Sequence, residues 1–422
     1  MMAKDILVIG GGISGITTAV EAAETGYNVI LVEKNPYLGG RVAQMNRYFP
    51  KLCPPYCGLE INLRRIRTNN RIKYFTLTEV EKISGQEGDY DVTLRIQPRF
   101  VSRKCTVCGE CNKVCPAQGP DAFNLGLSST KAIYLPHQLA FPYNYVIDEK
   151  ACIKCGSCVD ACKYGAIDLE MQAETKNINV GSIVVATGWQ PYDATRIDNL
   201  GFGKYKDVIT NMMMERLAAP NGPTQGKILR PSDQKEPKKV AFVQCAGSRD
   251  ENHLPYCSAV CCLASLKQIT YVRENIPDSQ AYMFYIDVRT PGKYEDFLTK
   301  VSGDEKVSLI KGKVASVEEV YHLVEDANTK ELIVEAEDIL AGKKIKVHVD
   351  MVVLACGMQP TNGLSVNINE ACLVRDKNGF INFEQGNGIY AAGVAKRPAD
   401  VSSSVQDATG TALRAIQSVV RG

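Results

Sequence analysis

The sequence lacks three features: an excess of charge, a long apolar run and a recognisable secretion signal. Its 422 residues carry 49 Lys and Arg against 47 Asp and Glu, a net charge of +2. This balance gives no electrostatic basis for binding nucleic acid. The most apolar stretch, Ile6–Val20, is too short to span a bilayer and is interrupted by glycines. We therefore expect a cytoplasmic chain with no membrane span of its own and with reduced cysteines.

Histidine is also scarce, with four residues in the whole chain. His137 and His253 stand isolated in the sequence, and we expect both to be surface or packing residues. No general base or substrate pocket is recognisable from the pattern. Hydrophobic residues make up 45% and charged residues 23% of the chain, which is typical of an ordinary folded protein of two to four domains.

Cysteine, by contrast, is abundant, with sixteen residues. Eight of them form two copies of the spacing Cys-x2-Cys-x2-Cys-x3-Cys, which is the bacterial ferredoxin spacing for four-iron clusters. The first copy comprises Cys105, Cys108, Cys111 and Cys115, and the second comprises Cys152, Cys155, Cys158 and Cys162.

In this pattern three thiolates wrap one cluster and the fourth reaches across to the other. The spacing therefore predicts one site made of Cys105, Cys108, Cys111 and Cys162, and a second made of Cys152, Cys155, Cys158 and Cys115. Zinc knuckles and disulfides are the alternatives. Zinc sites need only two Cys-x2-Cys pairs, and disulfides are rare in a reducing compartment.

The N-terminus carries a glycine motif in the context of a dinucleotide site. An apolar run of strand type, Ile6–Ile9, is followed by Gly10, Gly12 and Gly15 and by a helical pattern through Glu24. Glycines at such a junction let the backbone approach a pyrophosphate at the helix N-terminus. A second strand, Asn28–Val32, ends at Glu33, which is placed to accept hydrogen bonds from an adenosine ribose.

The residues that follow favour FAD over NAD. The stretch KNPYLGGR at Lys34–Arg41 resembles the loop after the second strand in flavoproteins with two dinucleotide domains, such as the glutathione and thioredoxin reductases. IVVATG at Ile183–Gly188, MVVLACG at Met351–Gly357 and GIYAAGV at Gly388–Val394 resemble further landmarks of those proteins. The resemblance implies flavin contacts at Lys34, Gly40, Arg41, Val80, Thr187, Gly188 and Gly393. Val394 departs from it, because an Asp usually stands there.

The resulting fold class is α/β, a two-dinucleotide-domain flavoprotein with an inserted α+β ferredoxin domain of two clusters. We expect a first flavin-domain part at 1–98, the inserted ferredoxin domain at 99–172, and a flavin-domain continuation with a solvent-facing connector at 173–235. A second nucleotide-domain-like module follows at 236–357 and the last flavin-domain part at 358–422. The stretch Ala117–Asp148 is expected to be an ordered loop packed on the clusters.

A third group of cysteines stands where the second nucleotide domain should carry its own glycine motif. After the strand Val240–Gln244 the chain reads CAGSR and then YCSAVCC, which supplies Cys245, Cys257, Cys261 and Cys262. These residues are candidate ligands of a third four-iron cluster, and the expected NAD(P)H site is replaced. Adjacent helical residues diverge by about 100°, so ligation by both Cys261 and Cys262 needs local distortion. Small buried structural cysteines are the alternative.

Together these motifs resemble the A subunit of heterodisulfide reductase over essentially the whole chain. The longer members of that family add an N-terminal domain and a C-terminal ferredoxin, and the compact build is most similar to the A subunits of quinone-interacting membrane-bound oxidoreductases of sulfate reducers. That resemblance implies FAD, several four-iron clusters, and two partner subunits: a second flavoprotein of the same type and a membrane subunit with haem b and a quinone site. It also implies peripheral attachment to the inner membrane and an adenylylsulfate reductase as electron partner.

Two further cysteines, Cys53 and Cys57, lie in the stretch FPKLCPPYCGLE. They lie near the place where disulfide reductases keep a redox dithiol, and three interpretations stay open: redox or flavin-contacting thiols, a ligand of the third cluster, or structural cysteines.

We therefore expect an oxidoreductase subunit that carries electrons between the menaquinone pool and adenylylsulfate reductase, with electron bifurcation at the flavin as one mode. The rival is a dithiol–disulfide reductase that uses Cys53 and Cys57.

Overall fold

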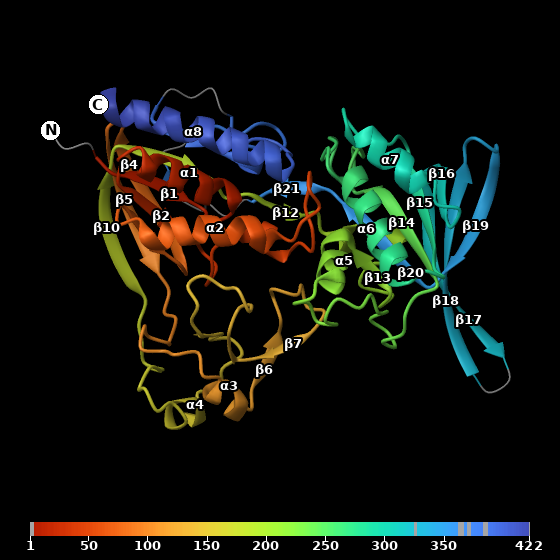
Figure 1. The fold of residues 1–422 in the computed structure, drawn as a ribbon, viewed down its shortest axis with the longest axis horizontal. Helices are drawn as coiled ribbons and strands as arrows, with labels where there is room; N and C mark the ends of the chain where they lie inside the picture. Colours follow the sequence, from red (N-terminus) through yellow and green to blue (C-terminus); the bar gives the residue numbers. More distant parts are fainter. Residues whose placement is uncertain (1–3, 325–326, 362–366, 369–372, 383–386, 422) are drawn as a thin grey trace. The chain divides into compact units, whose positions relative to one another are not determined.

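The computed structural model describes residues 4–324, 327–361, 367–368, 373–382 and 387–421. The chain forms two compact units, and Figure 1 draws both. Unit 1 comprises Met1–Gln190 with Pro360–Gly422, and unit 2 comprises Pro191–Gln359. Each unit is described by itself.

Unit 1 is built on a five-stranded parallel sheet in the order β23-β11-β1-β2-β3. Its strands are β1 (Ile6–Ile9), β2 (Val29–Val32), β3 (Ile72–Phe75), β11 (Ser182–Val185) and β23 (Ile389–Ala391). Three helices accompany this sheet: α1 (Ile13–Glu24), α2 (Pro55–Thr68) and α8 (Val401–Arg421). All four residues of β1, of β2 and of β11 are buried, as expected for strands covered on both faces.

The two faces of this sheet pack against different layers. Ile6 and Val8 of β1 join a core with the apolar residues of α1 and α8, whereas Leu7 and Ile9 join a second core. A sheet in the order β10-β5-β4-β22 packs on this face and contributes Val80, Val92 and Val180, among others, to that second core. Its strands are β4 (Thr78–Gln86), β5 (Asp89–Ile96), β10 (Glu174–Val180) and β22 (Asn367–Ile368).

The ferredoxin segment lies between β5 and β10 and has its own small core, which includes Phe100, Ile133 and Ile147. The stretch Ala117–Asp148, expected to be an ordered loop, contains two short antiparallel pairs. These pairs join β6 (Gln118–Pro120) to β7 (Ser129–Lys131) and β8 (Ile133–Tyr134) to β9 (Val146–Ile147). Two single-turn helices, α3 (Glu110–Val114) and α4 (Ser157–Asp160), pack on each other.

Unit 2 has a second five-stranded parallel sheet, in the order β13-β20-β14-β15-β16. Its strands are β13 (Val208–Thr210), β14 (Lys239–Ala246), β15 (Gln280–Tyr285), β16 (Val307–Lys311) and β20 (Met351–Cys356). The helices of this unit are α5 (Asn211–Ala218), α6 (Cys261–Asn275) and α7 (Tyr294–Ser302). An antiparallel sheet of β17 (Val314–Val324), β18 (Ala327–Asp338) and β19 (Lys343–Val349) shares a buried core with the parallel sheet.

Short elements complete the two units. They are the strands β12 (Trp189–Pro191) and β21 (Met358–Pro360), and the 3-10 turns η1 (Gly40–Gln44), η2 (Ala194–Arg196), η3 (Asp198–Leu200) and η5 (Gly393–Ala395).

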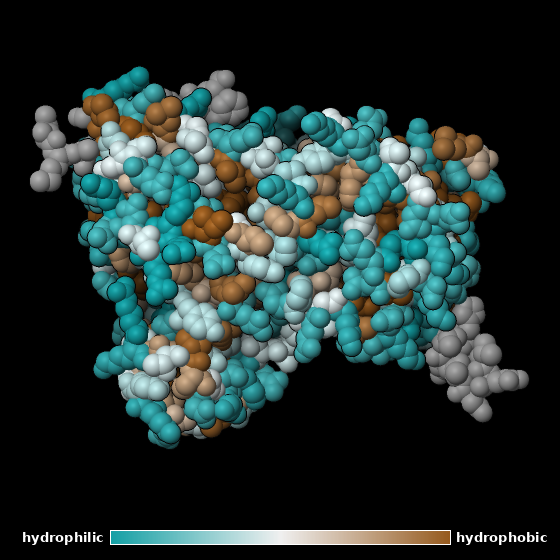
Figure 2. All heavy atoms as spheres, in the orientation of Figure 1, coloured by the Kyte–Doolittle hydropathy of each residue, from teal (hydrophilic) through white to brown (hydrophobic). Residues whose placement is uncertain are grey.

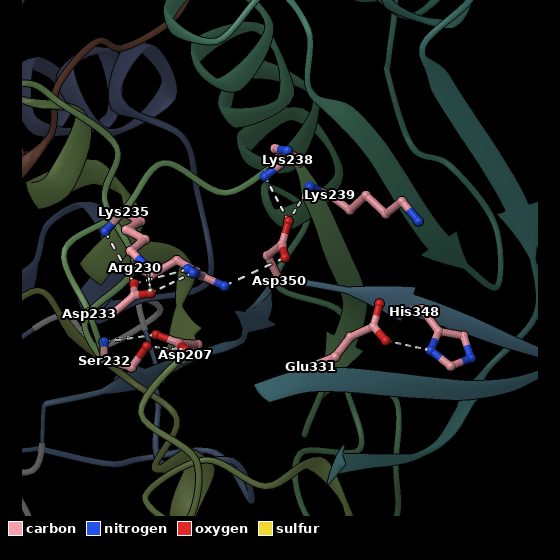
Figure 3. Close-up of polar contacts among 10 residues, drawn as sticks. All are labelled: Asp207, Arg230, Ser232, Asp233, Lys235, Lys238, Lys239, Glu331, His348 and Asp350. Atoms are coloured by element: carbon pink, nitrogen blue, oxygen red, sulfur yellow. Dashed lines mark hydrogen bonds and ion pairs between the residues drawn. The ribbon is translucent and has the colours of Figure 1, made fainter. Parts of the chain in front are cut away.

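The division into units differs from the expected domain boundaries at one place. Residues 191–235 were expected to continue the flavin domain and then form a solvent-facing connector, but they belong to unit 2, because β13 pairs with β20 of the second sheet. The connector is also held by polar contacts (Figure 3). Asp207 accepts hydrogen bonds from the backbone N–H and the hydroxyl of Ser232, at 2.9 and 2.6 Å. Asp350 accepts from the backbone N–H groups of Lys238 and Lys239, at 2.7 and 2.8 Å.

Within the part of the chain that the structure describes, no helix combines the length and the apolar character needed to cross a bilayer.

Candidate functional site

The first part of the site is the turn between β1 and α1, where two glycines are sterically required. A Cβ atom on Gly10 would lie 2.3 Å from the carbonyl oxygen of Ala186, and one on Gly15 would lie 1.8 Å from the carbonyl oxygen of Gly10. Gly10 also has φ of 110°, a conformation that favours glycine. At Gly12, which caps α1 without a side-chain bond, the nearest atom lies 3.9 Å away. The helix N-terminus therefore offers free backbone amides to an anion such as a pyrophosphate.

Glu33, at the end of β2, braces this turn. Its Oε2 accepts a hydrogen bond from the backbone N–H of Gly11 at 2.7 Å, and its Oε1 accepts from the backbone N–H of Asn35 at 2.8 Å. The side chain is buried, and this burial raises the pKa of Glu33 although the hydrogen bonds act in the opposite direction. The carboxylate predicted to bind a ribose thus also fixes the loop that would hold the adjoining phosphates.

The structure gathers most of the other predicted flavin contacts around the same turn. A Cβ on Gly40 would lie 2.8 Å from Cα of Gly12, and one on Gly393 would lie 2.1 Å from Oγ of Ser14. Arg41 lies close by, donating to Gln44 at 3.0 Å, and burial lowers the pKa of its guanidinium. Thr187 and Gly188 directly follow Ala186, whose carbonyl faces Gly10.

Two further predicted contacts differ in exposure. The Lys34 side chain, next to Glu33, is exposed, and the Val80 side chain is buried in the core between the two sheets of unit 1, in the same cluster as Ile9.

Val394 stands where related flavoproteins carry an Asp, but another carboxylate, not predicted from the sequence, lies beside this position. Asp407, on α8, accepts a hydrogen bond from the backbone N–H of Gly393 at 2.7 Å and pairs with Nζ of Lys396 at 2.7 Å. No motif signals this residue, because its position depends on how α8 packs beside η5.

The second part of the site is a pair of cavities in the ferredoxin segment, each lined by four cysteines. One cavity is lined by Cys105, Cys108, Cys111 and Cys162. The other is lined by Cys115, Cys152, Cys155 and Cys158. We call them site I and site II. The fold thus groups the thiols in the crossed pattern that the spacing predicts, with the last cysteine of each motif in the other motif's site.

Both cavities share a local loop geometry. Val107 and Lys154, two residues after the first cysteine of each motif, have φ of 57° and 53°, which is uncommon for residues other than glycine. This conformation turns each backbone N–H onto the preceding thiol: Val107 donates to Sγ of Cys105 and Lys154 to Sγ of Cys152, both at 3.4 Å. Such bonds favour the thiolate form that a metal cluster requires.

The third group of cysteines lies in unit 2. Cys245 is near the end of β14, Cys257 lies in the following loop, and Cys261 and Cys262 begin α6. Burial and then the neighbouring Cys262 raise the pKa of Cys245 to about 11. Burial, followed by the charges of Cys245, Cys262 and Cys257, raises the pKa of Cys261 well above its usual value. The four thiols therefore lie close enough to influence one another, and a cationic cluster would favour their ionisation.

Cys257 repeats the loop geometry of the ferredoxin motifs. Ala259, two residues later, has φ of 59°, and its N–H donates to Sγ of Cys257 at 3.3 Å. Cys261 and Cys262 diverge as expected for neighbours on a helix. Sγ of Cys261 lies 3.8 Å from the carbonyl oxygen of Cys356, whereas Sγ of Cys262 lies 3.7 Å from that of Asp287. Binding one cluster through both residues requires these thiols to turn.

Cys356 is a further thiol that the sequence analysis left without a role. It is fully buried at the end of β20, and burial raises its pKa to about 12. Among the described residues, no three His, Cys, Asp or Glu side chains converge to hold a single metal ion.

Cys53 and Cys57 lie in unit 1 on either side of the start of α2. Cys53 is half-buried and Cys57 is exposed. Both approach Tyr48: burial raises the pKa of the Tyr48 phenol, and the charges of Cys53 and Cys57 add to that rise. The structure thus brings the two thiols to one side chain.

The two isolated histidines have packing or hydrogen-bonding partners. The ring of His137 stacks on Phe123 with centroids 4.5 Å apart. Nδ1 of His253 lies 2.7 Å from the hydroxyl of Tyr192.

Matches to known proteins agree with this geometry. The family model described as "FAD dependent oxidoreductase" matches residues 5–56, and the model described as "4Fe-4S dicluster domain" matches residues 104–167. The A subunit of the H(2):CoB-CoM heterodisulfide,ferredoxin reductase of Methanothermobacter marburgensis is 36% identical over 99% of this chain and 64% of its own length. The iron-sulfur A subunit of the CoB-CoM heterodisulfide reductase of Methanocaldococcus jannaschii is 38% identical over 97% of this chain and 63% of its own length.

This chain is related to the A subunit of heterodisulfide reductase. The resemblance to that family predicted from the motifs is confirmed, and the chain spans somewhat less than two thirds of the length of these relatives. At the level of class, the predicted oxidoreductase with FAD and four-iron cofactors is also confirmed.

Comparison with solved structures confirms the predicted fold of this chain. Thioredoxin reductase from Lactococcus lactis superposes with a TM-score of 0.54 at 12% identity, covering 99% of this chain and 100% of that one. The enzyme from T. acidophilum gives 0.52 at 14% identity and covers 99% of both chains. At such identities the likeness concerns the fold alone.

Proposed function

We propose that this chain is the flavin- and cluster-bearing electron-transfer subunit of a heterodisulfide reductase-type complex. Bound FAD would exchange electrons in pairs and each cluster would exchange one at a time, so the chain can join two-electron to one-electron chemistry. The residues of the β1–α1 turn hold the dinucleotide, with Gly10, Gly12 and Gly15 admitting the backbone and Glu33 fixing the loop.

The crossed cysteine cavities carry this proposal. Structural zinc sites typically combine two ligand pairs of Cys-x2-4-Cys type, whereas sites I and II each take three thiols from one motif and one from the other. This exchange is the arrangement of two-cluster ferredoxins. Because the segment lies within the same unit as the nucleotide turn, clusters and flavin belong to one electron path.

The third group of cysteines, in unit 2, is a further candidate cluster site. Its support is the left-handed conformation of Ala259, two residues after Cys257, and the mutual electrostatic influence of Cys245, Cys257 and Cys261. We assign Cys245, Cys257, Cys261 and Cys262 to a third four-iron cluster.

For the partners, we infer the arrangement of quinone-interacting membrane-bound oxidoreductases: a second related flavoprotein, a haem b subunit in the membrane that docks this chain peripherally, and exchange of electrons between menaquinone and adenylylsulfate reductase. Its support is the resemblance of the cysteine and flavin motifs to the A subunits of those complexes. Purification of the native protein should recover haem and quinone activity with it, and a chain that purifies without either contradicts this assignment.

Cofactor content tests the proposal directly. Anaerobically purified protein should contain one FAD and about twelve irons, because three clusters of four are assigned. Replacing Cys155 or Cys257 by Ser should each remove about four irons while FAD is retained. Cys356→Ser is the matched control, since Cys356 is buried and lies outside every assigned ligand set. A wild-type content of about eight irons, unchanged in Cys257→Ser, would remove the third cluster.

A second candidate rests on the two thiols beside Tyr48. In this alternative the chain is a dithiol–disulfide reductase in which Cys57, the exposed thiol, attacks a disulfide and Cys53 resolves the mixed disulfide. The two electrons that reduce the substrate come from the Cys53–Cys57 dithiol, which the flavin then regenerates.

A further inference from the structure

Sites I and II are built on the same loop but have different surroundings. Apart from the cysteines, site II is lined by alanine, glycine, isoleucine and leucine. Site I is lined in part by polar side chains, namely Thr106, Glu110, Tyr145 and Tyr164. Two clusters bound in these cavities would therefore meet different hydrogen-bond donors.

The first difference lies two residues after the second cysteine of each motif. In the second motif this position is Ser157, which does not line site II itself but whose hydroxyl oxygen lies 3.5 Å from Sγ of the site II ligand Cys155. In site I it is Glu110, whose carboxylate pairs with Nζ of Lys113 at 2.7 Å. An ionised carboxylate accepts hydrogen bonds and cannot donate one, so site I has no counterpart of the Ser157 hydroxyl at this position.

Site I has a hydroxyl from another element instead. Tyr145 directly precedes β9, is 8% exposed, and lines the cavity together with Cys105, Cys108 and Cys111. A Cβ atom on Gly109, the residue between Cys108 and Glu110, would lie 3.6 Å from the Tyr145 hydroxyl oxygen. Among the described residues no hydrogen-bond acceptor is found for this hydroxyl. The hydroxyl lies on a side chain that lines site I, and sulfur of a cluster in that site would provide its acceptor.

We propose that two different hydroxyl groups tune the two ferredoxin clusters separately: Tyr145 donates a hydrogen bond to sulfur at site I, and Ser157 donates one to sulfur at site II. This inference rests on the proposed occupation of both sites by four-iron clusters. Reduction adds negative charge to a cluster, and donors to its sulfurs stabilise that charge, so each hydroxyl raises the reduction potential of its own cluster. The order of the two clusters in the electron path then depends on two residues that can be changed independently.

The experiment is a redox titration of the anaerobic holoprotein followed by electron paramagnetic resonance. Tyr145→Phe keeps the ring and removes only the hydroxyl, and Ser157→Ala does the same for the serine. We expect each substitution to lower the equilibrium constant for reduction of one cluster about tenfold, which lowers its reduction potential by about 59 mV for a one-electron couple. Tyr143→Phe is the control, because Tyr143 is 56% exposed and lines neither site. Ser157→Thr, which keeps a hydroxyl, should retain the wild-type potential.

The outcomes separate this inference from the proposed function. Two results overturn the inference and leave the cluster assignment intact. In the first, Tyr145→Phe or Ser157→Ala keeps its full iron content and its potentials are unchanged. In the second, both variants shift the potential of the same cluster. A wild-type protein without four-iron clusters refutes the proposed function itself. If Tyr145→Phe loses the iron of site I, the two variants at Ser157 provide the test. A potential that is lowered in Ser157→Ala and restored in Ser157→Thr supports separate tuning. Equal potentials in these two variants overturn the inference.

Discussion

At the scale of single residues, Glu33 shows how one side chain can serve both fold and site. It accepts hydrogen bonds from the glycine turn on one oxygen and from Asn35 on the other, although it is almost fully buried. Burial costs the ionised form more than these bonds return, so the pKa of Glu33 lies above its ordinary value of 4.5. The carboxylate is therefore retained at an energetic cost, which is typical of a ligand-binding position.

This shift predicts a pH dependence with a definite sign. A raised folded-state pKa means that the contribution of Glu33 to stability is complete below about 4.5 and is lost as the pH rises through the folded value. In urea unfolding at a series of pH values, the wild type should lose stability relative to Glu33→Gln across that window. The variant should also release FAD more readily, because its amide NH2 faces the donors of Asn35.

Glu24→Gln is the control for this measurement, since Arg65 lowers the pKa of Glu24. Its contribution is present above the unfolded pKa and is lost as the pH falls, and solvent screening keeps it small. A wild-type profile parallel to that of Glu33→Gln would contradict the prediction.

At the residue scale, spacing predicts groups of residues that are local in sequence and gives no sign of residues placed by tertiary contacts. The crossed cysteine sets follow from a pattern local in sequence. Tyr145, Asp407 and Cys356 come to their sites from other elements, and no periodicity or motif marks them. The tuning residue Ser157 stood within the motif, but its role depends on a comparison with Glu110 that only the paired cavities make visible.

At the scale of elements, strand pairing rather than local composition determines where unit 2 begins. The polar stretch before Lys239 reads as a connector, yet β13 and α5 precede it and pack into the second parallel sheet. Between α5 and α6 lies a buried ion pair, with Nζ of Lys267 3.0 Å from Oε1 of Glu215. Buried charges require partners, and this pairing between helices distant in sequence could not be read from either helix alone.

The start of α2 gives the test that separates the two functions proposed above. Cys57→Ser replaces a nucleophilic sulfur by a hydroxyl of similar size at an exposed position, so packing should change little while a thiol–disulfide step is abolished. We expect the variant to keep its FAD and both ferredoxin clusters and to retain most electron transfer between its partners, measured anaerobically with the complete complex.

Three results of that experiment lead to different conclusions. Complete loss of transfer with all cofactors present would favour the dithiol reductase. Loss of about four irons together with activity would assign Cys57 to a cluster. Retained transfer agrees with the electron-transfer function, and Cys53→Ser should then behave in the same way.

At the scale of the whole molecule, the two units repeat one parallel-sheet plan with different contents. In unit 1 the first strand leads through three glycines directly into α1. The surface of the ferredoxin segment, in the lower part of Figure 2, carries both apolar and polar side chains. Ile153 and Tyr164, which line the two cluster cavities, are 65% and 52% exposed there.

In unit 2 the corresponding strand, β14, leads into a different junction. Residues 247–260 separate it from α6, so the helix N-terminus does not follow the strand as it does in unit 1. Cys245 has φ of 57°, and the pairing of β14 with β20 is irregular between Val243 and Ala246. The acidic residue after the second strand, Asp287, is paired with Arg249 and Arg289. A ribose would have to compete with two guanidinium groups for that carboxylate.

We therefore predict that NADH and NADPH do not reduce the flavin of this chain directly. In unit 2 the glycine turn that would admit a pyrophosphate is absent, the helix amides lie beside the thiols of Cys261 and Cys262, and the ribose-binding carboxylate is engaged. Anaerobic mixing of the holoprotein with either nucleotide should leave the flavin absorbance unchanged over the time of catalysis. Dithionite is the positive control, because it reduces accessible flavin and clusters without a nucleotide site. Rapid stoichiometric bleaching by NADH or NADPH would contradict the prediction, and it would require a nucleotide site outside the β14–α6 junction.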